Sequence, residues 1–118
     1  MSSTGRSGSG PQAAAGPAQQ QPHPRHDLDT LLLHGVRFSV LAVVVSAEKV
    51  AFAYVRDALQ VSDSVLSKQL TALDEAGYVR IDKVAEGRRA RTWLYATDEG
   101  RTAFRRHHAA LVAIADDS

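Results

Sequence analysis

Three arginines in four positions, Arg88, Arg89 and Arg91, follow Gly87 in this chain of 118 residues. The planar guanidinium group of arginine matches the oxygens of a phosphate, and the narrow minor groove of duplex DNA attracts arginine. The wider segment 80–91 carries five basic residues against two acidic ones, although the net charge of the chain is only +1. Positive charge gathered in one segment favours a single phosphate-facing edge over a uniformly basic surface.

A group of small polar residues precedes these arginines, on a predicted helix that Ser62 caps and Gly77 ends. Spacing residues 100° apart around the helix axis gathers Leu66, Leu70 and Leu73 on one face. The candidate DNA-contacting residues are the cap, three residues of the opposite face and one on its flank: Ser62, Ser64, Lys68, Thr71 and Ser67. Hydroxyl groups and lysine can donate to phosphates or to base edges. A polar face is also typical of any solvated amphipathic helix, so the neighbouring arginines are what favour DNA.

Hydrophobic spacing predicts the elements that position these residues. Helices are expected over 28–33, 36–46, 52–60 and 62–77, with a two-residue strand at 50–51. The apolar period then changes from 3.6 to 2, which predicts strands over 78–84 and 92–97 around a polar tip at 85–91. Thr97 is expected to cap a long last helix, 98–115. The predicted fold class is therefore α+β: a winged helix-turn-helix with four helices, a two-stranded wing hairpin and a long C-terminal helix.

Residues 1–26 differ in composition from the remainder of the chain. They are rich in Gly, Ser, Pro, Gln and Ala, with almost no large apolar side chain to offset the entropy of ordering. We therefore expect a flexible tail over 1–26 and one DNA-binding and dimerisation domain over 27–118. No apolar run approaches the roughly 18 residues of a membrane span, and no secretory signal is recognisable. A cytoplasmic protein without a membrane partner is expected.

The sequence shows no arrangement typical of catalysis or metal binding. Adjacent carboxylates such as Asp74 and Glu75 diverge on a helix, and no glycine-rich phosphate loop follows a predicted strand. The absence of cysteine excludes disulfides, thiolate zinc sites and thiol redox sensors. His107 and His108 point about 100° apart at the edges of the last helix's apolar stripe, as surface histidines or a pH-sensitive dimer contact would. We expect no enzyme, no metal and no cofactor.

The segment from Val61 to Val79, VSDSVLSKQLTALDEAGYV, resembles the recognition helix and first wing strand of MarR- and ArsR-type regulators. GRRARTWL (87–94) and TDEGR (97–101) resemble a short single-domain subgroup of winged-helix proteins, and the likeness spans residues 28–111. It implies a regulator of transcription that binds double-stranded DNA, with Ser64, Ser67, Lys68 and Thr71 facing the major groove and the three arginines on the wing. One departure is Gln60, where such proteins often have glycine. Glutamine fits there if its backbone is right-handed or only mildly strained.

A homodimer is expected, because one recognition helix contacts too few base pairs for useful specificity. Spare apolar residues lie on the first and last predicted helices, which form the dimer interface in the resembled family: Leu28, Leu31, Leu32, Phe104, Leu111 and Ile114. These residues could instead pack on their own core. Of Trp93/Tyr95 and Leu94/Ala96, one pair should face the core, and the pattern does not say which.

The chain is small and leaves little surface for recruiting partners, so a repressor acting by occupancy is favoured over an activator. Two alternatives stay open. One is a switch that responds to an unknown small-molecule effector bound between the terminal helices and the DNA-binding lobe. The other is a winged helix used as a protein-interaction module, which predicts no salt-dependent affinity for DNA.

Overall fold

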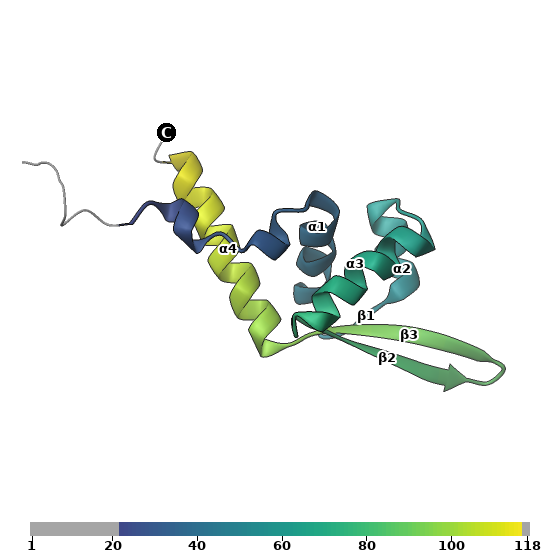
Figure 1. The fold of residues 1–118 in the computed structure, drawn as a ribbon. Coiled ribbons are helices and arrows are strands. Elements are labelled where there is room, and N and C mark those ends of the chain that lie inside the picture. Colours follow the sequence, from purple (N-terminus) through teal and green to yellow (C-terminus); the bar gives the residue numbers. More distant parts are fainter. Residues whose placement is uncertain (1–21, 117–118) are drawn as a thin grey trace, which may run out of the picture.

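The computed structural model describes residues 22–116, which form a helical body with a long two-stranded hairpin projecting from it (Figure 1). The elements in chain order are the 3-10 turns η2 (Pro24–Asp27) and η3 (Thr30–Leu32), then α1 (Gly35–Val45), β1 (Val50–Ala51), α2 (Phe52–Leu59), α3 (Asp63–Glu75), β2 (Val79–Glu86), β3 (Arg89–Ala96) and α4 (Asp98–Asp116). Apart from its first helix, the predicted order of elements is confirmed, and so is the winged helix-turn-helix architecture. Of the tail expected over 1–26, residues 1–21 lie outside the described residues.

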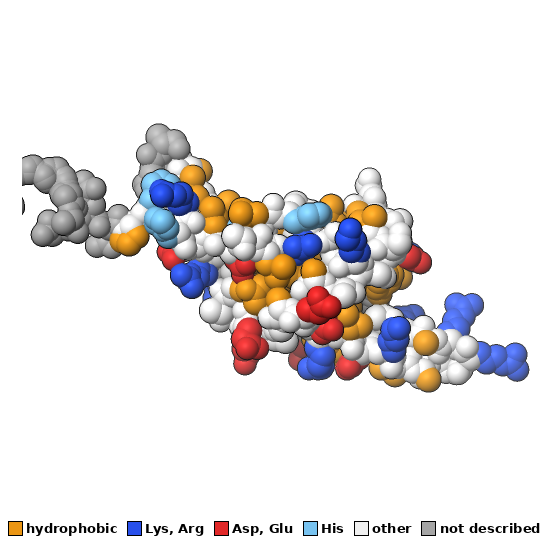
Figure 2. Space-filling view, in the orientation of Figure 1, with side chains coloured by type: hydrophobic (Ala, Val, Ile, Leu, Met, Phe, Trp, Pro, Cys, Tyr) orange, Lys and Arg blue, Asp and Glu red, His pale blue; other side chains and the backbone are white. Residues whose placement is uncertain are grey.

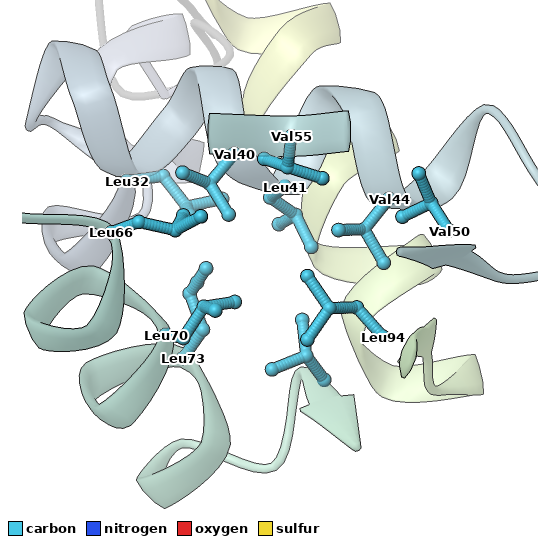
Figure 3. Packing of buried hydrophobic residues seen from close by; sticks show 11 residues of the cluster. Leu32, Val40, Leu41, Val44, Val50, Val55, Leu66, Leu70, Leu73 and Leu94 are labelled. Atoms are coloured by element: carbon cyan, nitrogen blue, oxygen red, sulfur yellow. The ribbon is translucent and has the colours of Figure 1, made fainter. Parts of the chain in front are cut away.

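The core lies where α1 meets α2, α3, α4 and the central strand β3. This central position explains why α1 is apolar nearly all round, since it is covered on most sides. Figure 3 shows the leucines and valines of α1, α2, α3 and the sheet pointing toward one another. The fully buried members of this cluster are Leu41, Val40, Val44, Val55, Leu66, Leu73 and Leu94.

The sheet has the strand order β1-β3-β2, with antiparallel pairing on both sides of β3. The pairing of β2 with β3 continues to Glu86 opposite Arg89, and only Gly87 and Arg88 form the turn. Gly87 has φ +65°, which glycine adopts without strain. The predicted seven-residue tip at 85–91 is therefore wrong. Neither face of a protruding hairpin is buried, so its strands are held by the backbone ladder and show no apolar alternation.

The register assigns each wing residue to one of two faces. Leu94 is fully buried, so Thr92 and the residue opposite it, Lys83, share the face toward α3. Trp93 and Tyr95 lie on the other face and are partly exposed. Of the two pairs that alternate on this strand, Leu94 and Ala96 therefore face the core, and Trp93 and Tyr95 face outward.

The helix predicted over 28–33 is absent, and two 3-10 turns take its place. The first of them begins at Pro24, inside the segment expected to be a tail. Leu28 and Asp29 between them have extended backbones, and Asp29 caps the second turn. Its N–H donates to Nδ1 of His107 at 2.9 Å, and its carboxylate accepts from the Tyr78 hydroxyl and from the N–H of Leu31.

Two residues are more buried than the sequence suggested. Leu32 is only 2% exposed and belongs to the core of its own chain, so its assignment to a dimer interface is wrong. His107, expected on the helix surface, is 1% exposed and packs edge-on against Phe38. Burial lowers the pKa of His107 below its usual 6.5, which favours the neutral ring that accepts from Asp29.

The start of α4 packs unusually close to the chain that enters the wing. Thr97 caps the helix as predicted: its hydroxyl accepts from the N–H of Gly100 at 2.9 Å and donates to the carbonyl of Gly77. Gly100 is buried, and a Cβ at this position would lie 2.0 Å from the carbonyl oxygen of Tyr78. Only glycine allows α4 to approach the wing this closely.

The turn between α2 and α3 contains a strained residue. Gln60 has φ 57° and ψ 46°, in the left-handed region, and is the only described non-glycine residue with a positive φ. The right-handed backbone considered for Gln60 is therefore wrong. Such a conformation costs about 1 kcal/mol for a residue with a Cβ.

We expect Gln60→Gly to raise the free energy of unfolding by about 0.5 kcal/mol, because relief of the strain exceeds the added flexibility of the unfolded chain. Thermal unfolding measured beside Gln60→Ala tests this prediction, since alanine keeps the strain. A melting temperature that is equal for the glycine and alanine variants would contradict it.

Candidate nucleic-acid interface

The helix α3 exposes all five of its predicted contact residues: Ser62, Ser64, Ser67, Lys68 and Thr71. Its start is fixed by the predicted cap, since the Ser62 hydroxyl accepts from the N–H of Val65. Gly77 ends the segment with φ +80°, also as predicted. Lys68 forms no ion pair with any described residue, and its ammonium group is free for a ligand. The hydroxyl of Thr71 donates to the carbonyl of Ser67, which leaves it as an acceptor.

A buried polar contact fixes how α3 sits on the body. Gln69 is buried among the leucines of α3, and its Oε1 accepts from Nε of Arg37 at 2.9 Å. The same guanidinium donates to the carbonyl of Leu31 at 3.1 Å, which ties α1, α3 and η3 together. Helical spacing alone does not predict this pair. The available signal was the position of Gln69, a polar residue between Leu66 and Leu73 on the apolar face.

A second contact holds the carboxylate at the start of α3. Arg56 of α2 donates to Asp63 at 3.1 Å and to Asp57 at 2.9 Å, and these carboxylates raise its pKa above the usual value. An unpaired Asp63 would repel phosphates approaching the N-terminal end of α3. Arg56 therefore offsets part of this repulsion, although it is shared with Asp57 and the three groups together keep one net negative charge. Nothing in the sequence spacing singled out Arg56.

The three wing arginines have different surroundings. Arg88 lies in the turn, and Arg89 pairs across the hairpin at its last rung; both are exposed, and neither forms an ion pair with a described residue. Arg91 lies 3.4 Å from Glu86 and above the ring of Trp93, on the sheet face that points away from α3. Figure 2 shows Lys and Arg side chains at the far end of the wing. Arg88 and Arg89 thus lie at the tip without an ion-pair partner among the described residues, whereas Arg91, on the same sheet face as Arg89, lies beside Glu86 and Trp93.

The outward face of the sheet carries further stacked cations. Nζ of Lys49 lies 4.4 Å from the ring centre of Trp93, and the guanidinium of Arg80 lies 4.1 Å from the ring centre of Tyr95. Cations held over aromatic faces in this way are partly satisfied by the ring quadrupole. The cations of this face are therefore less available to phosphates than those of the tip.

A hollow separates α3 from the wing. It has a volume of about 310 Å³ and is lined by Ser67 and Thr71 from α3, Lys83 and Thr92 from the wing, and the apolar floor Phe52, Leu70 and Ile81. Lys83 is one of the five basic residues of the segment 80–91 and is not among the residues that the sequence pattern predicts to contact DNA. The signal that could have found it is its position two residues after Ile81, which places both on the face toward α3.

Within residues 22–116, no group of three His, Asp or Glu side chains lies together in a way that could hold a metal ion. Over the same residues, every helix is too short or too polar to cross a bilayer. The exposed hydroxyls, the free lysine and the arginine-tipped hairpin make a surface that can donate to many oxygen acceptors at once. Such a surface suits a polyanion with a regular phosphate spacing.

This fold and surface define a winged helix protein, and the comparison with known families places it further. Residues 36–115 match the family of winged helix DNA-binding domains, and the chain belongs to that family. An uncharacterized protein of Methanocaldococcus jannaschii is 32% identical over 72 residues, which cover 61% of this chain and 78% of the relative.

Solved structures of transcriptional regulators share the fold. One is a transcriptional regulator homologue of Pyrococcus horikoshii, with a TM-score of 0.69 and 25% identity over 74% of this chain and 86% of that one. A MarR family regulator of Silicibacter pomeroyi has a TM-score of 0.60 and 25% identity over 80% of this chain and 63% of that one. A regulator of M. tuberculosis in complex with DNA has a TM-score of 0.62 and 20% identity over 80% of this chain and 67% of that one. The predictions of a MarR-like winged helix and of a DNA-binding transcriptional regulator are confirmed.

Proposed function

We propose that this regulator binds double-stranded DNA sequence-specifically, as a homodimer that represses transcription by occupying its operator. The observation that carries the proposal is the exposed polar face of α3 beside the arginine-tipped wing. The family match supports DNA as the ligand, and the regulator of M. tuberculosis with the same fold is in complex with DNA. The protein would act without catalysis, in the cytoplasm.

The N-terminal half of α3 would enter the major groove. Ser64, Lys68 and Thr71 point away from the buried leucines, and the groove of B-form DNA, about 12 Å wide, accepts one helix. The ammonium group of Lys68 can donate to the O6 and N7 acceptors of guanine. Arg88 and Arg89 would reach the neighbouring minor groove or its phosphates. Arg91 would contribute less than the other two, because its Nε lies 3.4 Å from Glu86, although its side chain stays 54% exposed.

A dimer through the N-terminal segment and α4 is supported by the apolar surface that stays uncovered there. Leu111 and Val112 are 36% and 46% exposed on α4, and Leu28 and Leu31 are only half-buried. Phe104 stacks on Phe38 of its own chain at 5.2 Å and is partly exposed, as is Ile114. A two-fold dimer would double the number of base contacts and predicts a palindromic operator.

The test is selection of bound duplexes from a random pool, followed by affinity measurements on Lys68→Ala. We expect a palindromic consensus, and a loss of about 1–3 kcal/mol in binding free energy for the selected duplex with Lys68→Ala, more than for a scrambled duplex. Arg105→Ala, which removes an equal charge from the exposed side of α4, is the control and should change little. If the full-length protein shows no salt-dependent affinity for any duplex, the proposal fails and a protein-interaction module is favoured.

A hollow between η2 and α4 favours a second candidate function, a switch controlled by an effector. It has a volume of about 630 Å³, and its lining includes four carboxylates, Asp27, Asp29, Asp98 and Glu99, together with Arg106 and His26. This lining would favour a cationic effector. The switch predicts that operator affinity falls when such a ligand is added, whereas a constitutive repressor keeps its affinity.

A further inference from the structure

We infer that the hollow between α3 and the wing is a seat for one backbone phosphate of the DNA, with Lys83 as its cation. The inference rests on the proposed function and adds a cation, Lys83, that lies on neither the recognition helix nor the wing tip. Its ligand is a phosphodiester of the DNA strand, and its contribution is affinity without base preference.

The path of the DNA strand leads to this position. In B-form DNA a single phosphate strand separates the major groove from the neighbouring minor groove. When α3 lies in the major groove and the tip of the wing reaches the next minor groove, the strand between them passes through the space between α3 and the wing. That space is the hollow of about 310 Å³ between Ser67, Thr71, Lys83 and Thr92.

The chemistry of the lining suits a phosphate. Lys83 is exposed, lies on the wing face toward α3 and forms no ion pair with a described residue. The hydroxyls of Ser67 and Thr92 take part in no hydrogen bond within residues 22–116, so both can donate to phosphate oxygens. The floor of Phe52, Leu70 and Ile81 is apolar and offers no competing partner. One ammonium group and two free hydroxyls around an open hollow match the single charge and the acceptor oxygens of a phosphodiester.

The matched control is Lys49, the other lysine packed against this sheet. Lys49 lies over Trp93 on the opposite face and carries the same charge. Lys83→Ala and Lys49→Ala therefore change the net charge equally, and both replace an exposed side chain. Thermal unfolding of both variants checks that neither change disturbs the fold.

The experiment measures dissociation constants for the selected duplex and a scrambled duplex over a series of salt concentrations. We expect Lys83→Ala to lower the slope of log affinity against log salt by about 0.9 on both duplexes, which is the loss of one phosphate contact. Lys83→Arg should restore the slope, and Lys49→Ala should keep it. A single neutral methylphosphonate can also be placed at successive positions of the DNA backbone. At one position per half-site it should lower the affinity of the wild-type protein and leave the affinity of Lys83→Ala unchanged.

Three results would overturn the inference: an unchanged slope for Lys83→Ala, an equal loss for Lys49→Ala, or a loss confined to the selected duplex, which would make Lys83 a base-reading residue. In each of these cases the wild-type protein still binds DNA and the proposed function stands. Absence of salt-dependent binding by the wild-type protein would instead refute both.

Discussion

Replacing Gly100 by alanine should lower the free energy of unfolding by about 3 kcal/mol or more, a large part of the 5–15 kcal/mol typical of a small domain. The added Cβ would lie 2.0 Å from the carbonyl oxygen and 2.8 Å from the carbonyl carbon of Tyr78. Both atoms belong to the backbone, which also accepts from the N–H of Thr97. The structure can relieve the overlap only by moving α4 away from the chain that enters the wing. Chemical denaturation of the variant measures the loss.

Gly35→Ala is the matched control for this change. Gly35 is the first residue of α1, and a Cβ there would meet no atom within 4 Å. We expect Gly35→Ala to be neutral or to stabilise the protein by up to about 1 kcal/mol, because alanine is the better helix former. If Gly100→Ala unfolds at the same denaturant concentration as the wild type, the packing of α4 against Tyr78 is wrong.

Removing both free arginines of the wing tip should weaken binding to every duplex by a similar factor. Arg88→Ala with Arg89→Ala removes two cations that have no protein partner among the described residues, so we expect a fall of about 1.8 in the slope of log affinity against log salt. This corresponds to a loss of roughly 10- to 100-fold in affinity at about 0.1 M salt. Titrations of the selected and scrambled duplexes at several salt concentrations measure both quantities.

The control removes an ion pair from the same hairpin without changing its net charge. Glu86→Ala combined with Arg91→Ala deletes the 3.4 Å pair on the face away from α3, and we expect the salt slope to stay near the wild-type value. A loss equal to that of the tip variant would mean that the whole hairpin, rather than its free arginines, carries the contact.

Much of the interface could be predicted from the sequence because its residues follow one local period. The capped helix α3, with buried leucines and exposed Ser64, Lys68 and Thr71, depends only on the 3.6-residue repeat and on Ser62. The wing was harder. The outer part of the hairpin is exposed on both faces, so no apolar alternation marks where pairing ends or which face Arg91 takes.

The remaining misses share a different cause, which is contact between residues distant in the sequence. Gln69 is held by Arg37, and the burial of His107 depends on Asp29 and Phe38. Such pairs satisfy polar groups that the helix itself would leave unsatisfied in the core, and their partners come from other elements. A period along one helix cannot reveal them.

The contact between Asp27 and Arg106, at 2.8 Å, has a practical consequence for labelling the protein. It joins the first described segment to the last helix, and Figure 1 shows η2 beside the far half of α4, at the end of the molecule opposite the wing. A fluorophore or an affinity handle fused next to residue 22 or residue 116 would therefore start on the side remote from α3 and the hairpin. Either attachment point leaves α3 and the hairpin of its own chain unobstructed but lies near the proposed dimer surface around Leu111 and Val112, so a label there would report on association of two chains.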